Sequence, residues 1–140
     1  MISFNYESDF ILEHESVFSD WLSNVIESEK KNEGEINYIF CDDDYLLGLN
    51  QQYLNHDTLT DIISFDYSIG NELHGDIFIS IERVLENAEE FKVSFEEELK
   101  RVMVHGILHY CGYKDKSESD ELIMRGKEEE KMKMFHVKQK

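Results

Sequence analysis

The first 41 residues alternate between strand and helix patterns, and this order constrains the fold more than any other feature of the chain. Apolar side chains alternate over Met1–Tyr6, which predicts a strand. They recur at helical spacing from Val17 to Ile26, and a second strand is predicted at Ile36–Cys41 after a polar turn at Lys30–Glu35. A strand–helix–strand unit favours a parallel pair of strands, because the helix returns the chain to the same end of the sheet.

The middle of the chain predicts a hairpin, and the rest predicts helices. Asp61–Tyr67 and Asp76–Ser80 are rich in strand-forming residues and flank a turn at Gly70–Asn71. Further helices are predicted at Tyr45–Tyr53, Ile81–Phe91, Ser94–Gly112 and Ser119–Met134, followed by a basic tail that frays from about residue 135. We therefore expect an α+β fold with one domain over residues 1–140. Its mixed four-stranded sheet, a parallel unit plus an antiparallel hairpin, is covered by about five helices.

Charge is distributed unevenly along the chain. Residues 1–98 carry 4 Lys/Arg and 24 Asp/Glu, a net charge of −20, whereas residues 99–140 carry 10 and 7, a net charge of +3, which gives −17 in all. The negative body repels nucleic acid at long range, but the positive part is compatible with an anionic substrate. The alternative is that the acidity only aids solubility. The positive side chains are Lys100, Arg101, Lys114, Lys116, Arg125, Lys127, Lys131 and Lys133.

The sequence lacks the signals of a membrane or secreted protein. No apolar run approaches the roughly 20 residues of a membrane helix. The N-terminal segment MISFNYESDF lacks the basic start and apolar core of a signal peptide. We therefore expect a cytoplasmic protein with no membrane partner, in which Cys41 and Cys111 are reduced and packed as small apolar residues.

Two histidines and an acidic residue in the segment HGILHYCGYKD have the spacing of metal ligands. His105 and His109 are four positions apart, so a helix places them on one face. Gly112 can end that helix in a left-handed conformation and turn the chain back, so that Asp115 supplies a third ligand. Three protein ligands leave a fourth position open, as in catalytic zinc sites. We therefore predict one zinc ion per chain, although the same ligand set also suits iron(II).

The spacing is also similar to the zinc-peptidase pattern HExxHxxGxxH, in which the glutamate is the general base. Here Gly106 occupies the position of that glutamate, so peptide hydrolysis by the usual route lacks its proton acceptor. We expect the glycine to leave open space on the metal face for a bulky substrate.

The segment from His105 to Tyr113 resembles the zinc signature HGxLHLxGYDH of the YbeY-type endoribonucleases. Upstream, Leu49–Asn50 with Tyr53 and Thr60–Phe65 resemble the family's LNxxYR and TDVLSF motifs. Gly75–Ser80 resembles its GDIxIS motif, and Met124 with Glu128 resembles the M-x-x-x-E of its last helix. The resemblance implies a zinc-dependent endoribonuclease that cleaves single-stranded RNA during maturation of small-subunit ribosomal RNA. It implies ribosomal RNA and the small ribosomal subunit as partners, and no DNA.

Three positions depart from the family pattern, and one of them, Leu59 in place of the usual proline before Thr60, is expected to change only the stiffness of the loop. The family's third histidine falls on Asp115, so the resemblance implies a carboxylate ligand there, and the family's arginine after Tyr53 falls on Leu54. Arg101, Lys114 and Lys116 are candidates for binding the substrate and offsetting its negative charge.

Other roles have more than one interpretation. Asp61, Asp66 and His74 could orient ligands or act as bases, or could be polar residues of turns and strand ends. Attack on the phosphodiester by water and attack by the ribose 2′-hydroxyl both fit a zinc site. A zinc peptidase and a non-catalytic, ribosome-associated binding module with a structural metal are the alternatives to the endoribonuclease.

Overall fold

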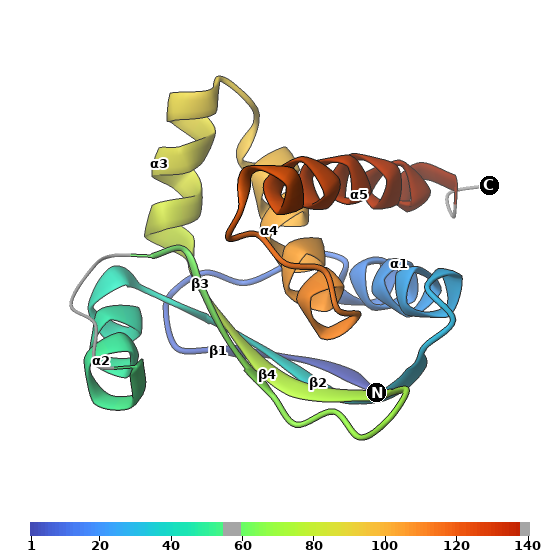
Figure 1. Cartoon of the computed structure of the whole chain (residues 1–140). Coiled ribbons are helices and arrows are strands. Elements are labelled where there is room, and N and C mark those ends of the chain that lie inside the picture. Colours follow the sequence, from blue (N-terminus) through green and yellow to red (C-terminus); the bar gives the residue numbers. More distant parts are fainter. Residues whose placement is uncertain (55–59, 138–140) are drawn as a thin grey trace.

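The computed structural model describes residues 1–54 and 60–137, and for residues 54, 136 and 137 it describes the backbone alone. Four strands and five helices follow one another in this part of the chain (Figure 1). In order they are β1 (Ile2–Tyr6), α1 (Glu15–Ser28), β2 (Asn32–Cys41), α2 (Asp43–Leu54), β3 (Ile62–Asp66), β4 (Glu72–Ser80), α3 (Ile81–Phe91), α4 (Phe95–Tyr110) and α5 (Glu118–Val137).

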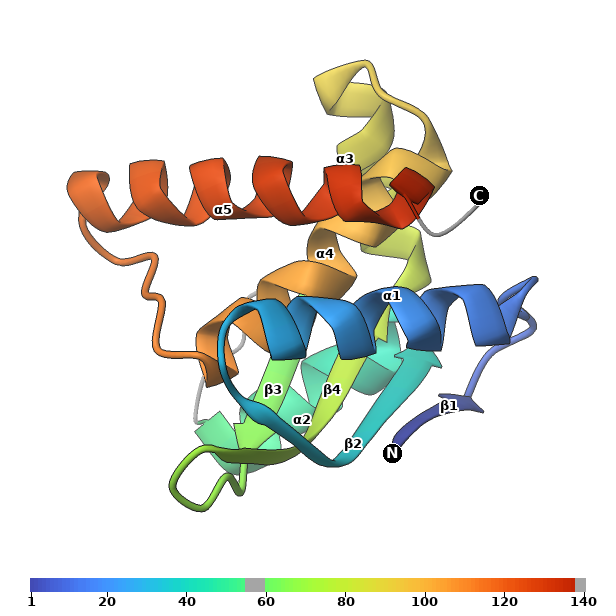
Figure 2. The ribbon, with the colours of Figure 1, turned by 90° about the vertical axis from the view of Figure 1, so that its right-hand side faces the viewer.

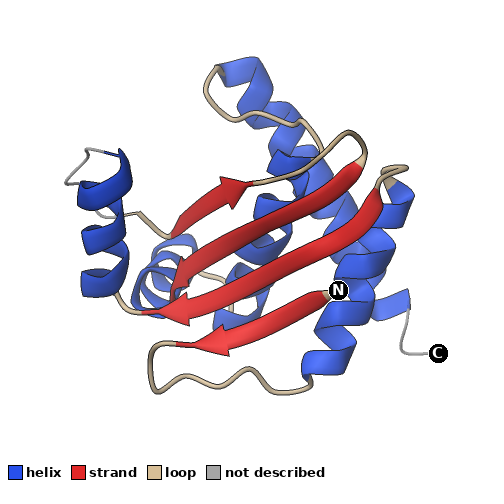
Figure 3. Ribbon diagram, turned by 90° about the horizontal axis from the view of Figure 1, so that it is seen from below, coloured by secondary structure: helices blue, strands red, loops and turns tan. Residues whose placement is uncertain are grey.

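The strands form one mixed sheet in the order β1-β2-β4-β3, which confirms the predicted α+β fold (Figure 3). Strand β1 runs parallel to β2, as the strand–helix–strand pattern predicts, and β2 runs parallel to β4. Strand β3 pairs with β4 in the antiparallel sense, so that Ser64 lies opposite Ile77 in the predicted hairpin.

The two faces of the sheet are covered by different helices. On one face, Tyr38 of β2 and Ile77 of β4 belong to the main core with α1 and α4. On the other, α2 contributes Leu46 to a smaller cluster with Cys41 and Ile63. Helices α1 and α5 lie side by side over the main core (Figure 2). No helix within the described ranges is long and apolar enough to cross a membrane.

The largest differences from the predicted boundaries lie in β2, β4 and α5. The polar turn predicted at Lys30–Glu35 is too long, because β2 already begins at Asn32 and pairs there with Glu72 of a longer β4. Backbone pairing between strands does not require apolar side chains, so the pattern missed this polar extension. Helix α5 continues to Val137, beyond the predicted end, and residues 138–140 of the predicted fraying tail lie outside the described residues.

Candidate metal centre

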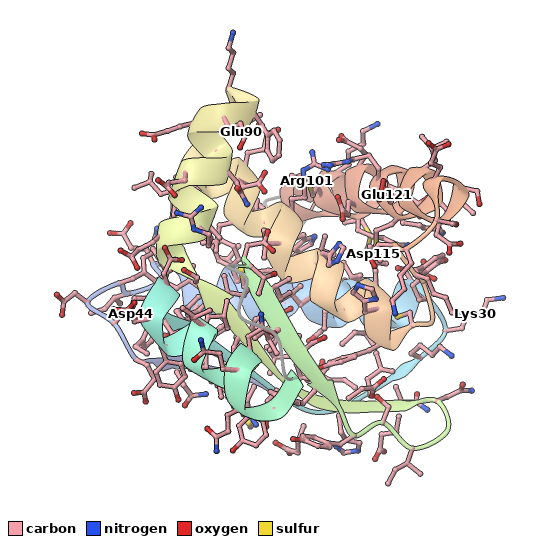
Figure 4. All side chains as sticks on the ribbon, turned by 60° about the vertical axis from the view of Figure 1, so that its left-hand side comes forward. Lys30, Asp44, Glu90, Arg101, Asp115 and Glu121 are labelled. Atoms are coloured by element: carbon pink, nitrogen blue, oxygen red, sulfur yellow. The ribbon has the colours of Figure 1, made fainter. Side chains whose placement is uncertain are left out.

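Helix α4 ends in a pair of hydrogen bonds that turn the chain back on itself. The Gly112 N–H donates to the His109 carbonyl at 3.0 Å, and the Tyr113 N–H donates to the Leu108 carbonyl at 3.1 Å, which together form a Schellman cap. Gly112 has φ 104°, so the predicted left-handed glycine is confirmed. The turn carries the following loop, with Asp115, back to the last turns of α4 (Figure 4).

Three ligand atoms converge between this loop and α4. Asp115 Oδ2 lies 3.2 Å from His105 Nε2 and 3.3 Å from His109 Nε2. One donor atom from each of the three residues lies within 4.8 Å of the others, which makes them a possible metal site. Ligand atoms held about 2.0–2.2 Å from a tetrahedral ion lie about 3.3–3.6 Å apart, so both nitrogen–oxygen distances fit a small divalent cation.

Glu128 of α5 fixes the orientation of one histidine. Its Oε2 accepts a hydrogen bond from His105 Nδ1 at 2.7 Å, so Nδ1 carries the hydrogen and Nε2 keeps its lone pair for a metal. Burial lowers the pKa of His105, but the hydrogen bond and charge of Glu128 outweigh it, so the pKa is raised overall. The sequence signal for Glu128 was the M-x-x-x-E spacing, which assigned it no role.

The predicted substrate-binding cations lie in different surroundings. Arg101 lines a cavity beside the histidines, where its guanidinium donates to Glu128 at 3.1 Å and to Glu129 at 2.8 Å. Lys114 and Lys116 are exposed on the loop around Asp115 and line neither of the two cavities that contain His105.

Two cavities flank the candidate metal site, with volumes of about 420 Å³ and 600 Å³. They share four lining residues, namely His105, Asp115, Arg125 and Glu128. The Arg125 side chain is 57% exposed, so it can reach a bound anion from either cavity. Sequence reasoning counted Arg125 among the positive residues but did not single it out.

The three other polar candidates separate into one inside the site and two outside it. Asp61 lines the 420 Å³ cavity, and burial raises the pKa of its carboxyl group although His105 partly opposes the rise. His74 Nε2 forms a hydrogen bond with Glu72 Oε1 at 2.6 Å, and Asp66 Oδ1 accepts a hydrogen bond from the Ser68 N–H at 2.9 Å. Neither His74 nor Asp66 lines a cavity that contains the histidines, so both match the turn and strand-end interpretation.

The expected role of Gly106 is wrong. A Cβ atom at this position would lie 3.0 Å from Ile77 Cδ1 and 3.3 Å from Ile62 Cδ1, so the glycine faces the sheet and opens no space on the metal face. The helical period alone predicts that Gly106 faces the core, because it places Gly106 on the same face as the buried residues Met103 and Tyr110. Gly106 therefore allows α4 to approach the sheet closely.

Both cysteines are free thiols, as expected. Cys111 follows α4 directly, and burial raises its pKa to about 11. A thiol with a raised pKa is mostly protonated at neutral pH and is a poor nucleophile, which agrees with a packing role.

Together, the fold and this geometry define an α+β protein with a candidate mononuclear metal centre of two histidines and one aspartate. A sequence model of the family described as "Endoribonuclease YbeY" matches residues 3–136. The chain therefore belongs to the Endoribonuclease YbeY family.

Similar proteins support the assignment over the whole length. The chain is 74% identical over 139 residues to "Endoribonuclease YbeY" of Flavobacterium psychrophilum, covering 99% of each chain. It is 70% identical to the protein of the same name from Flavobacterium johnsoniae, covering 99% of this chain and 100% of the relative. The solution structure of TM1509 from Thermotoga maritima superimposes with a TM-score of 0.70 at 27% identity, covering 99% of this chain and 91% of that one.

The upstream family motif also contributes to the site. Thr60, Asp61, Ile62 and Ser64 of the TDIISF segment line the 420 Å³ cavity next to the histidines. Leu54, which stands where the family pattern has an arginine, ends α2, and its side chain lies outside the described residues.

Proposed function

We propose that the protein is a zinc-dependent endoribonuclease that cleaves single-stranded RNA, with residues 1–140 forming one catalytic domain. The observation that carries this proposal is the convergence of His105 Nε2, His109 Nε2 and Asp115 Oδ2 on one point. Imidazole and carboxylate are ordinary zinc ligands, and three protein ligands leave a position open for substrate or water. Iron(II) also accepts this set, but zinc suits the helix-and-loop spacing of the ligands better.

The chain itself can bind and orient a phosphodiester at this site. When bound, the ion supplies Lewis-acid chemistry, which polarises a phosphoryl oxygen and lowers the pKa of water. Arg101 and Arg125 line the cavity beside the ligands and offset negative charge on the phosphate as it develops. Lys114 and Lys116, on the exposed loop, contact phosphates farther along the strand.

Two nucleophiles fit the site, and the product ends distinguish them. Attack by the ribose 2′-hydroxyl leaves a 2′,3′-cyclic phosphate and fails when the scissile nucleotide is 2′-deoxy. Attack by water needs no 2′-hydroxyl and leaves a linear phosphate. Mapping the ends of an RNA cleaved by the metal-loaded protein therefore identifies the route.

The family assignment supports a wider biological role as part of the same proposal. We expect the protein to act in maturation of small-subunit ribosomal RNA, with that RNA and the small ribosomal subunit as partners. We expect this RNA maturation to take place in the cytoplasm. DNA is not an expected substrate.

Incubating zinc-loaded wild type and a His109→Ala variant with structured RNA and with casein tests the proposal. We expect the wild type to cleave RNA within single-stranded segments and to leave casein intact, and the variant to cleave neither. Cleavage of casein would instead support a peptidase, and equal RNA cleavage by the variant would remove the metal site from the reaction. Zinc affinity of Asp115→Ala tests the third ligand separately, and unchanged affinity would exclude it.

A further inference from the structure

One aromatic side chain on the wall of the catalytic cavity has no structural role in the core. Phe91 is the last residue of α3, and it lines the same 420 Å³ cavity as His105 and His109. Phe91 is 53% exposed, and it is the only phenylalanine among the exposed large apolar residues of the described ranges. Within those ranges no other aromatic ring packs against it. A ring in this position offers a flat apolar surface to a ligand in the cavity.

Asn87 lies one helical turn before Phe91 on the same wall of the cavity. Its Nδ2 donates a hydrogen bond to Asp61 Oδ2 at 3.3 Å, which holds the amide in place. In the described part of the chain, Asn87 Oδ1 has no hydrogen-bond donor. The wall therefore combines a face for stacking with an amide oxygen that can accept a hydrogen bond from a nucleobase.

The length of the cavity along α4 indicates that it can hold more than the scissile phosphate. Glu98 lines the cavity seven positions before His105 on α4. Since an α-helix rises 1.5 Å per residue, the cavity extends about 10 Å along α4 from His105. That is about three times the 3.4 Å spacing of stacked bases, so the far end accommodates a neighbouring nucleotide rather than the scissile phosphate.

We infer that Phe91 and Asn87 form a base-binding subsite that holds one unpaired base of the RNA next to the cleaved bond. The inference rests on the proposed function and adds the source of its preference for single strands. A base within a duplex is stacked on both faces and paired along its edge, so it cannot occupy the subsite, whereas an unpaired base can stack on an aromatic ring. Arg101 and Arg125, in the same cavity, attract the adjoining phosphates.

The test compares Phe91→Ala, Phe91→Leu and Phe91→Tyr with wild type on a short oligoribonucleotide whose cleavage position is known. We expect kcat/KM to fall about tenfold for the alanine and leucine variants and to stay near wild type for tyrosine, because stacking requires a ring. Leu85→Ala is the matched control, since Leu85 is 49% exposed on the same helix but does not line the cavity. Equal loss in the leucine and tyrosine variants would overturn the inference.

Substrates with one abasic nucleotide, placed in turn on each side of the scissile bond, locate the subsite. At one position the missing base should lower kcat/KM about tenfold for wild type and have no further effect on Phe91→Ala. Losses of similar size at every position, or losses that add to that of Phe91→Ala, would overturn the inference.

A binding measurement keeps this test separate from the proposed function. The chain's single tryptophan, Trp21, is fully buried and gives a constant background. The fluorescence of Phe91→Trp, measured before zinc is added so that neither route cleaves the ligand, should be quenched by a single-stranded 2′-O-methyl oligonucleotide and not by the matching duplex. If the wild type cleaves no RNA but quenching occurs, the proposed function fails and the base-binding subsite stands. Cleavage by the wild type without quenching overturns the subsite alone.

Discussion

Helix α5 contributes to two clusters of charged side chains, and the clusters differ in whether every charged group has a partner. The first, which we call the brace cluster, consists of Glu29, Tyr113, Lys127 and Lys131. Lys131 Nζ contacts Glu29 at 2.8 Å, Ser28 at 2.9 Å and Glu130 at 2.9 Å, which uses the three hydrogens of its ammonium group. Glu29 also accepts a hydrogen bond from Tyr113 at 2.7 Å. The charges in this cluster therefore satisfy one another without a ligand.

The site cluster, formed by Arg101, His105 and Glu128 with the other two ligands, is incomplete. When His105 carries its hydrogen on Nδ1, its Nε2 lone pair faces the Asp115 Oδ2 lone pairs at 3.2 Å. Two acceptors at this distance repel each other unless a cation lies between them. The charged groups of the brace cluster all have partners and stabilise the fold, whereas the ligand atoms of the site cluster have lone pairs available for a cation.

The two clusters are joined through the loop after α4. Tyr113 packs into the brace cluster, and Asp115 follows it by two residues in the site cluster. The brace cluster therefore helps to hold the loop that carries the third ligand. The comparison predicts that changes in the site cluster affect metal binding and cleavage, whereas changes in the brace cluster affect stability.

The largest effect is expected for His109→Ala. Removal of one ligand should lower zinc affinity and reduce RNA cleavage by about 10³-fold or more, because several kcal/mol of Lewis-acid stabilisation depends on the ion. Single-turnover cleavage assays at saturating zinc measure this effect. Activity within tenfold of wild type would show that the site cluster is not the catalytic centre.

A smaller effect is expected for Glu128→Gln, which leaves the ligands intact but removes the charge behind His105. Loss of such a supporting carboxylate typically costs 10–100-fold in metal affinity or activity, and the glutamine oxygen can still accept the hydrogen bond, so about tenfold is expected. Zinc titration gives the affinity. Glu129→Gln is the control, because Glu129 contacts Arg101 but not the histidines; an equal loss there would contradict the account.

In the brace cluster, Lys131→Met should change stability and not zinc affinity. Lys131 is 4% exposed and Glu29 is 11% exposed, and breaking such a pair leaves a buried charge. Because Lys127 and Tyr113 still contact Glu29, we expect a loss of about 2 kcal/mol in the free energy of unfolding. Urea denaturation measures it, with exposed Lys133→Met as control. A stability equal to that of wild type, or a zinc affinity that falls as for Glu128→Gln, would contradict the assignment of the brace cluster to stability alone.

The smallest effect is the pH dependence that Glu29 gives to stability. Burial alone raises the pKa of Glu29, but hydrogen bonds from Lys131 and Tyr113 outweigh it and hold the pKa below the usual 4.5. A carboxylate of this kind stabilises the fold above its unfolded-state pKa, and the stabilisation is lost as the pH falls through its folded-state pKa. The difference in unfolding free energy between wild type and Glu29→Gln should therefore be constant above about pH 5 and shrink at lower pH. A difference that grows on acidification would contradict this.

The sequence predicted the parts of this picture that depend on local pattern. Periodicity, strand-forming composition and capping signals located the nine elements, and the spacing of His105, His109 and Gly112 predicted how α4 would end. These features depend on residues within a few positions of one another. The predicted triad also lies together, because the cap at Gly112 fixes the path of the next residues.

The parts that depend on packing between distant segments could not be predicted in the same way. Glu128 reaches His105 across 23 positions only because α5 packs on α4, and Phe91 and Asn87 enter the cavity through the placement of α3. Arg101 was assigned to substrate alone, although its guanidinium also supports Glu128. The residue pattern within a single helix or strand does not predict these contacts, because each contact joins two different elements.

Anomalous diffraction from crystals of the zinc-loaded protein, measured at the zinc edge, tests the central claim most directly. We expect one peak per chain, about 2.0–2.2 Å from His105 Nε2, His109 Nε2 and Asp115 Oδ2. We expect no peak at the brace cluster of Glu29, Lys127, Lys131 and Tyr113. A peak that lies away from the two histidines, or no peak in protein that cleaves RNA, would contradict this claim.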